Sequence, residues 1–522
     1  MTKSKILLLL SASLSVLVAS SDVSTTSSVS PSEVAAMQKQ IADLQKQLTS
    51  LVKQLNEVKA KTEQKNIPQT PVVVKAQPAA APASPNVAVA QENPQQPQFD
   101  KGYIALPGTT AALKISGMIK LDMIRDTRAH TSEQTNMGRL PYALQMRNPT
   151  LPNTPTTWKD HYNIHGKQSR LRVDMNVKNK SGSDVKAYVE GDFFGLTQWG
   201  DAFPNGTAAN NGPQSSNAYN FRVRHAIFEY AGLEAGHTTT TFHLEEAILP
   251  SVDLNGINGG YVRHALIRYT HKLGGLSISA AAEQCRADYM TYTPTPAANT
   301  PHYIYNYEDG GGNLSKQERP DLIMKAKYNF ANGNAVGLSI INRDLRVRNN
   351  AAIAGNNAAT VDGKSYILNA WGLNLAAKIM TFGQSYFTGG ITTGKGLGWY
   401  ILDAHGRSAL FDPTASEGNR YKLVEMSIFW AGYSHCWGPQ WQTNIGFARV
   451  NLNTQGLSNA RRITQWFEPG LDKTYNKFII NTMYMPEENL QFGLEYFVLE
   501  RKSTLGYIGL GHRLQFGASY KF

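Results

Sequence analysis

The sequence predicts an all-β transmembrane barrel of about sixteen antiparallel strands, preceded by a periplasmic α-helical coiled coil. Three observations lead to this fold class. Apolar and polar residues alternate with a period of two in many segments after residue 112. Long and short connections alternate between these segments. Finally, only 17% of the 522 residues are charged, Gly reaches 44, and the longest apolar run is shorter than the roughly 20 residues of a membrane-spanning helix.

Residues 1–20 have the pattern of a secretory signal peptide. Lys3 and Lys5 precede the apolar stretch Ile6–Val18, and the small residues Ala19 and Ser20 follow. This order of charged, apolar and small residues directs export, and the segment is then removed. We therefore expect an exported chain.

Residues 30–61 form a predicted coiled-coil oligomerisation segment. Their apolar residues recur at spacings of three and four, which keeps one seam facing a partner helix. Ser30, Pro31 and Glu33 suit a helix start. The alternative is a single amphipathic helix packed on the barrel, although such helices carry a wider apolar stripe. Two or three strands are both compatible with the seam residues Val34, Met37, Ile41, Leu44, Leu48, Leu51, Leu55 and Val58.

Residues 62–101 form a predicted linker, and residues 102–522 form the barrel. Seven prolines lie between Pro68 and Pro97 among Ala, Gln and Val, a composition that cannot bury enough apolar surface to fold. In the barrel, an alternation such as Leu171, Val173 and Met175 against Arg172 and Asp174 would turn the apolar side to lipid.

The last strand, from Leu510 to Phe522, ends on an aromatic residue. This ending resembles the C-terminal insertion signal of bacterial outer-membrane barrels, which implies Phe522 as a signal for the barrel assembly machinery.

An even number of strands places both chain ends at the rim with the short turns, which would face the periplasm. The chain is therefore expected in the bacterial outer membrane, surrounded by outer-membrane lipid, with its stalk in the periplasm. Cys285 and Cys436 would lie near opposite rims, roughly 25 Å apart. Because a disulfide needs Cα atoms within about 7 Å, we predict no bond between them.

Basic residues on the polar face of the strands are candidate pore-lining residues, because Lys or Arg facing lipid costs about 2–4 kcal/mol. Some of these charges are expected simply to pair with lumen carboxylates. The alternation is mixed around Arg222 and Arg224 and around Arg263 and Arg268. Because Arg263 and Arg268 have opposite parity, a bulge or a rim position is needed for both to point inward. The candidates are Lys114, Lys120, Arg170, Arg172, Arg222, Arg224 and Arg263.

The third long connection, residues 242–260, is a candidate constriction loop. Its acids Glu245, Glu246 and Asp253 would face basic wall residues and create a transverse field. The alternative is an external loop helix with no role in the pore.

Several motifs resemble the DcaP-like family of outer-membrane porins: Gln168–Leu171, Glu190–Gly195, Arg222–Ala226, Ala235–Phe242 and Ile267–Thr270. The resemblance implies a trimeric diffusion channel that favours small anions, dicarboxylates among them. It further implies that Arg170, Arg172, Arg222, Arg224 and Arg263 are the selectivity residues. His237 and Thr239 depart from this family, which usually has Gln and an aromatic residue there.

Other functions fit the sequence less well. His225, His237 and His243 lie near Ser251 and Asp253, but no nucleophile signature surrounds them, so we predict no enzyme. We also predict no cofactor, no metal and no nucleic acid, because the 12 His are scattered and the basic residues form no run. The remaining alternative is a tether, in which the stalk links the outer membrane to the cell wall.

Overall fold

The structure is a computed structural model that describes residues 99–127, 160–179, 184–195, 220–254, 257, 262–284, 288–294, 301–307, 319–348, 365–404, 406–411, 416, 421–454, 471–504 and 506–522. The expected signal peptide, coiled coil and most of the linker lie outside these residues, as does Cys285. The described residues all belong to one compact unit, Pro94–Phe522.

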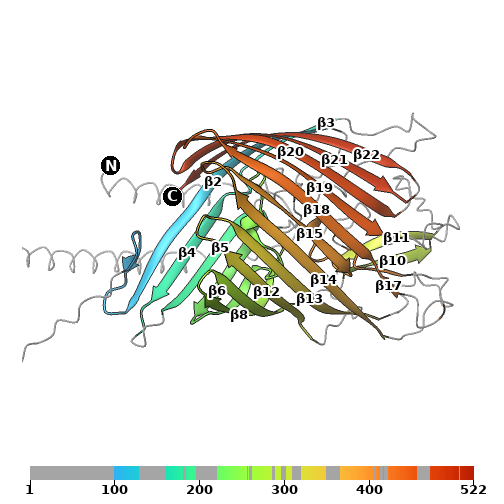
Figure 1. Ribbon diagram of the computed structural model, residues 1–522, viewed down its shortest axis with the longest axis horizontal. Coiled ribbons are helices and arrows are strands. Elements are labelled where there is room, and N and C mark those ends of the chain that lie inside the picture. The colour runs from blue at the N-terminus through green and yellow to red at the C-terminus, as the bar shows by residue number, and fades with distance from the viewer. Residues whose placement is uncertain are drawn as a thin grey trace, which may run out of the picture. The chain divides into compact units, whose positions relative to one another are not determined.

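Sixteen antiparallel strands close into a barrel (Figure 1). The described sheet has 18 strands, but β1 (Ile104–Ala105) and β3 (Asp160–His165) pair only with β2. Pairing of β2 with β22 closes the wall, as the sequence predicts. The wall strands are β2 (Ala111–Thr127), β4 (Arg170–Val177), β5 (Val185–Gly195), β6 (Asn220–Tyr230), β7 (Leu233–Thr239), β8 (Arg263–Leu273), β9 (Leu276–Glu283), β12 (Asp321–Asn329), β13 (Ala335–Arg348), β14 (Ser365–Met380), β15 (Tyr386–Lys395), β18 (Glu425–Cys436), β19 (Trp441–Asn453), β20 (Asp472–Glu487), β21 (Leu490–Ser503) and β22 (Ile508–Lys521).

The outer face of the wall is apolar. On β14, Leu373 and Leu375 are exposed, whereas Asn374 between them is buried inside the barrel. The same alternation on β2 exposes Ile119 and Leu121. Apolar side chains on the outside of a closed barrel are what a lipid environment requires.

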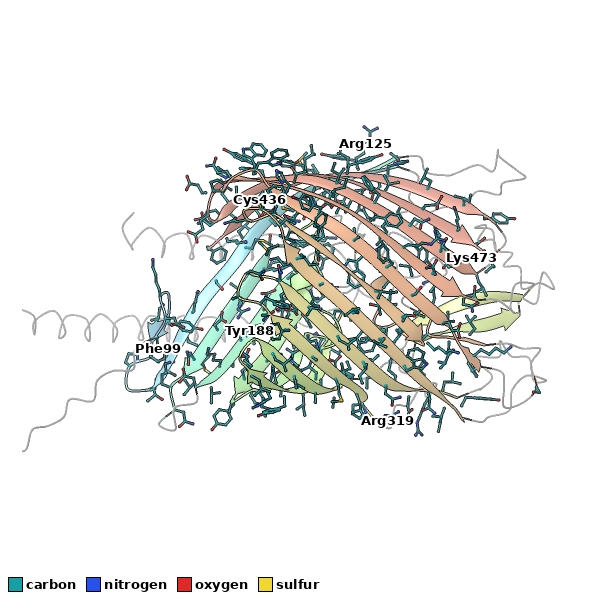
Figure 2. The ribbon with its side chains drawn as sticks, viewed as in Figure 1. Phe99, Arg125, Tyr188, Arg319, Cys436 and Lys473 are labelled. Carbon is teal, nitrogen blue, oxygen red and sulfur yellow. The ribbon has the colours of Figure 1, made fainter. Side chains whose placement is uncertain are left out.

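The two rims differ. Turns of two to five residues join β6 to β7, β12 to β13 and β18 to β19 at the turn rim, and β2 begins there beside the end of β22, where the Gly117 amide donates to the Phe522 carbonyl at 3.0 Å. Cys436 lies near this rim and Lys473 toward the other (Figure 2). A small second sheet stands at the loop rim (Figure 1), made of β10 (Asp288–Pro294), β11 (Pro301–Tyr307), β16 (Ala409–Phe411) and β17 (Tyr421–Leu423).

The inside of the barrel contains its own hydrophobic core. Two long connections fold inward, each with one 3-10 turn, η3 (Glu245–Ala247) and η5 (Leu402–Ala404). Their apolar side chains form one cluster with inward residues such as Trp430, Ile479 and Phe497. In the described part of the chain, no helix has the length and apolar character needed to cross a membrane.

Candidate functional site

The connection after β7, which we call the inner loop (residues 240–262), follows the inner wall strand by strand. At its start, the Thr240 hydroxyl and the Thr241 amide both donate to the Glu283 carboxylate of β9 at 2.7 Å. Lys325 of β12 then donates to the His243 carbonyl at 3.2 Å. Wall side chains therefore supply hydrogen bonds that a buried backbone would otherwise lack.

The middle of the inner loop continues across β15 and β20 in the same way. The Thr388 hydroxyl donates to the Ala247 carbonyl, and the Asn481 amide donates to the Pro250 carbonyl at 3.0 Å. The loop thus crosses the barrel interior in contact with the wall along its described length.

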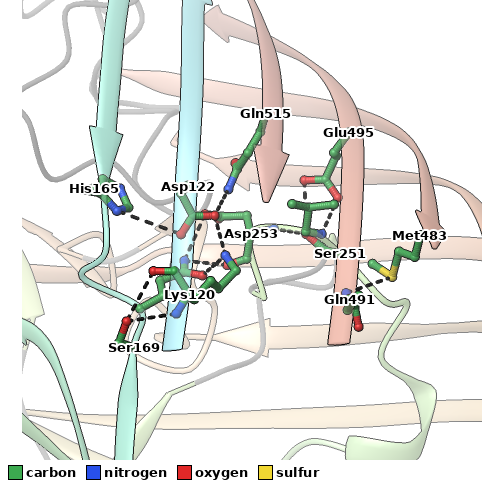
Figure 3. A network of polar contacts seen from close by, with 12 residues as sticks. Lys120, Asp122, His165, Ser169, Ser251, Asp253, Met483, Gln491, Glu495 and Gln515 are labelled. Atoms are coloured by element: carbon green, nitrogen blue, oxygen red, sulfur yellow. Dashed lines mark hydrogen bonds and ion pairs between the residues drawn. The ribbon is translucent and has the colours of Figure 1, made fainter. Parts of the chain in front are cut away.

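The tip of the inner loop reaches β21, β22 and the bend between β3 and β4 (Figure 3). The Glu495 carboxylate accepts from the Val252 amide at 2.8 Å and from the Ser251 hydroxyl at 3.2 Å. Gln168 donates to both the Asp253 carbonyl, at 2.8 Å, and its carboxylate, at 3.2 Å.

Glycines on the inward side of the wall make room for the loop's apolar side chains. A Cβ added at Gly493 or Gly517 would lie 2.6 Å from Val252, and one added at Gly446 would lie 2.6 Å from Leu249. These positions therefore cannot carry a side chain unless the loop moves. The glycines that face the loop in this way are Gly337, Gly432, Gly446, Gly493 and Gly517.

A second inner loop, residues 396–411, packs on the first. The His243 imidazole lies 2.7 Å from the Tyr400 carbonyl, and the Tyr400 hydroxyl donates to the Asp321 carboxylate at 2.9 Å. Lys477 of β20 forms an ion pair with Asp403 at 2.5 Å. The sequence predicts a long loop at this place but not that it folds inward.

Solvent reaches the opposite side of the interior. The side chains of Arg170, Arg172 and Arg222, on β4 and β6, are 24–35% exposed. By contrast, Arg343 and Arg501, which face the inner loops, are 0–1% exposed. The inner face of β4 and β6 therefore carries partly exposed positive charges.

Four guanidinium groups gather on this face around two carboxylates of β5. Arg222 binds Asp192 at 2.6 Å, and Arg224 bridges Glu190 at 2.9 Å and Asp192 at 2.8 Å. Arg170 lies 3.8 Å from Glu190. With Arg263, whose charge faces Arg224, Arg222 and Arg170, the arginine cluster holds four positive and two negative charges.

A β-bulge explains why the alternation is mixed here. Glu190 is paired with His225, but the next residue, Gly191, is paired with Val223. Arg224 is therefore an extra residue in β6, and bulges re-aim side chains in this way. The bulge allows Arg224 to reach the β5 carboxylates, while the His225 imidazole lies 2.8 Å from the Thr238 hydroxyl.

Arg172 and Arg263 differ in how fully they are paired. Arg172 binds Asp174 at 2.6 Å, with its guanidinium 3.6 Å above the centre of the Tyr188 ring. The Nε of Arg263 is buried and has no hydrogen-bond partner within the part of the chain that the structure describes. Arg263 therefore contributes positive charge that no direct ion pair there neutralises.

The remaining candidate residues lie elsewhere. Lys120 points inward but is only 5% exposed, because it binds Asp122 and Gln168 beneath the loop tip. Asp253 is in the same buried network, at 2% exposure (Figure 3). Lys114 lies near Gly102, close to the turn rim.

Glu245 and Glu246 border a cavity of about 370 Å³ near the turn rim, between η3 and the wall from β5 to β12. Glu246 accepts a hydrogen bond from Lys327 at 2.5 Å. Burial alone would raise the pKa of the Glu246 carboxyl, but Lys327 holds that pKa below its ordinary value. The described residues contain no group of three or more possible metal ligands.

Sequence reasoning missed Lys325 and Lys327 as site residues and left the side of Arg268 open. The signal was present, because the alternation in Asp321–Asn329 places both lysines opposite Leu322 and Met324. It also missed the inward glycines, which are visible only as Gly at polar-face positions of the strands.

These features define a transmembrane β-barrel channel whose interior is shaped by infolded loops. A family model described as a porin subfamily matches residues 95–503. The chain belongs to this porin subfamily and is an outer-membrane diffusion porin, a channel rather than an enzyme.

A solved structure supports the fold. The outer membrane channel DcaP of Acinetobacter baumannii is 17% identical, with a TM-score of 0.57, covering 79% of this chain and 97% of that chain. The barrel is thus DcaP-like. An anion-selective porin from Comamonas acidovorans is 11% identical, with a TM-score of 0.45, covering 79% of this chain and 100% of that chain. No curated protein sequence matches.

Substituting Gly493 by Ala should disturb the inner loop. The new methyl would collide with Val252, and such overpacking costs about 1–3 kcal/mol. We expect a lower urea midpoint for the folded barrel in detergent and noisier single-channel currents. The second substitution Val252→Ala should restore both, because it removes the collision.

Gly438→Ala is the matched control, since nothing lies within 4 Å of a Cβ there. If Gly438→Ala and Gly493→Ala behaved alike, or if Val252→Ala gave no rescue, the inner loop would not depend on close packing against these glycines.

Low pH should loosen the contact between the two inner loops. Burial lowers the pKa of the His243 imidazole from 6.5 to about 4. The neutral form therefore stabilises the loops fully above about pH 6.5, and this contribution of about 3 kcal/mol is lost as pH falls toward 4. We expect single-channel current fluctuations to increase over this range.

The variant His243→Gln keeps a donor for the Tyr400 carbonyl but cannot titrate. Its fluctuations should change less between pH 6.5 and 4 than those of the unaltered protein. Identical pH profiles for the two proteins would show that His243 is not the responsible group.

Proposed function

We propose that this porin favours small anions, dicarboxylates among them, and that the arginine cluster of Arg170, Arg222, Arg224 and Arg263 provides the preference. The observation that carries the proposal is the surplus of two positive charges over Glu190 and Asp192 on the solvent-exposed inner face. Such a surplus in a lumen with low-dielectric walls concentrates anions.

The position of Arg222 also favours the binding of a carboxylate. Arg222 remains 35% exposed even while it binds Asp192. A guanidinium has five donors in a planar fork, so it can hold one carboxylate of the wall and still offer donors to a solute. Arg170 on β4 and Arg222 on β6, the two strands that flank β5, would suit a solute that carries two carboxylates.

Replacing Arg222 by Gln should weaken the anion preference. A unit charge about 6 Å from a permeating ion in water is worth about 0.7 kcal/mol, or about threefold in permeability. Because the same charge attracts an anion and repels a cation, we expect the anion-to-cation permeability ratio to fall about tenfold, measured as the reversal potential of single channels under a KCl gradient.

Arg449→Gln is the control, because Arg449 is exposed on the opposite, outer face of β19 and the change in net charge is the same. An unaltered channel that prefers cations, or equal effects of the two variants, would contradict the proposal.

We further propose that the chain is exported by residues 1–20, is inserted through its terminal Phe522, and assembles as a trimer through the seam of residues 30–61. The 3.5-residue apolar repeat supports the assembly. Deleting residues 30–61 should lower the mass of the detergent-solubilised oligomer, or its resistance to dissociation, in light-scattering measurements. An unchanged trimer would assign assembly to the barrel instead.

A further inference from the structure

The cavity near the turn rim has a charge balance unlike that of the arginine cluster. Its cationic lining consists of Lys186, Arg268, Lys272, Lys325 and Lys327. Its carboxylates are Asp184, Glu229, Glu234, Glu245 and Glu246. Five positive and five negative charges surround a volume of about 370 Å³, which is large enough for a small organic solute.

One side of the cavity is built of cations and hydroxyls in register across three strands. Lys272, Ser277 and Lys327 form one row across β8, β9 and β12. Thr270, Ser279 and Lys325 form the next row. Ammonium and hydroxyl groups arranged this way offer convergent donors to a carboxylate.

The other sides offer carboxylates. Glu229 and Glu234 come from β6 and β7, and exposed Glu245 comes from η3. Glu234 is held by Arg268 at 2.6 Å. Among the described residues neither Glu229 nor Lys272 forms an ion pair, so each is available to a solute.

We propose that this cavity binds small zwitterionic solutes of the amino-acid type, with the carboxylate at the lysine and hydroxyl rows and the ammonium at Glu229. A dianion would satisfy the lysines but would meet five carboxylates without compensating them. A zwitterion matches both sets of charges, and its two groups are close enough together to fit the cavity.

The proposal rests on the channel function but not on the anion preference. From Arg224 to Glu229 the strand advances five residues, about 17 Å, toward the turn rim. The arginine cluster and the cavity are therefore separate sites in series, and each can fail without the other.

The test compares glutamate with glutarate, which has the same carbon chain and both carboxylates but lacks the ammonium. Each is added to single channels of the full-length protein in a planar bilayer in moderate KCl, and the half-blocking concentration is measured. We expect glutamate to block at a concentration at least about threefold lower, although it carries less net charge.

Glu229→Gln should remove this difference, and Glu487→Gln, at the exposed end of β20 outside the cavity, should preserve it. Glutarate blocking as well as glutamate in the unaltered protein would overturn the proposal, and this comparison needs no variant to fold. An unchanged preference in a conducting Glu229→Gln channel would also overturn it. The KCl reversal potential, recorded on the same channels, reports separately on the arginine cluster.

Discussion

A backbone taken inside a barrel loses water as its hydrogen-bond partner, and the interior of this porin is organised around that constraint. The inner loop is stable there because Glu283, Lys325, Asn481 and Glu495 bind its backbone from successive parts of the wall. An unsatisfied buried group of this kind costs about 1–3 kcal/mol. The wall and the loop are therefore one hydrogen-bonded unit, rather than a frame with a separate plug.

The same arrangement divides the interior into two halves. Where the inner loops lie, the wall is apolar or carries buried ion pairs such as Arg343 with Asp321. On the inner face of β4 and β6, by contrast, Arg170, Arg172 and Arg222 remain partly exposed. The inner loops thus fill one side of the barrel and leave charged side chains partly exposed on the other.

The balance of charge differs between two places on this side of the barrel. The arginine cluster carries a surplus of two positive charges, and the cavity nearer the turn rim is balanced. In series, the first would attract solutes by net charge and the second would distinguish them by the arrangement of charges within the solute. The β-bulge at Arg224 matters to this arrangement because it adds an arginine to the inward face without lengthening the strand.

The sequence by itself determined the barrel, since the period of two fixes which face meets lipid and the alternation of turns and loops fixes the topology. It also placed Arg170 and Arg172 on the inward face, opposite exposed Leu171 and Val173. Only the tertiary structure decided which inward residues meet solvent. Lys120 and Arg172 have the same local pattern, but the inner loop covers Lys120 and leaves Arg172 partly exposed. Alternation indicates on which side of a strand a residue lies. Whether a loop covers that residue depends on contacts between residues that are far apart in the chain.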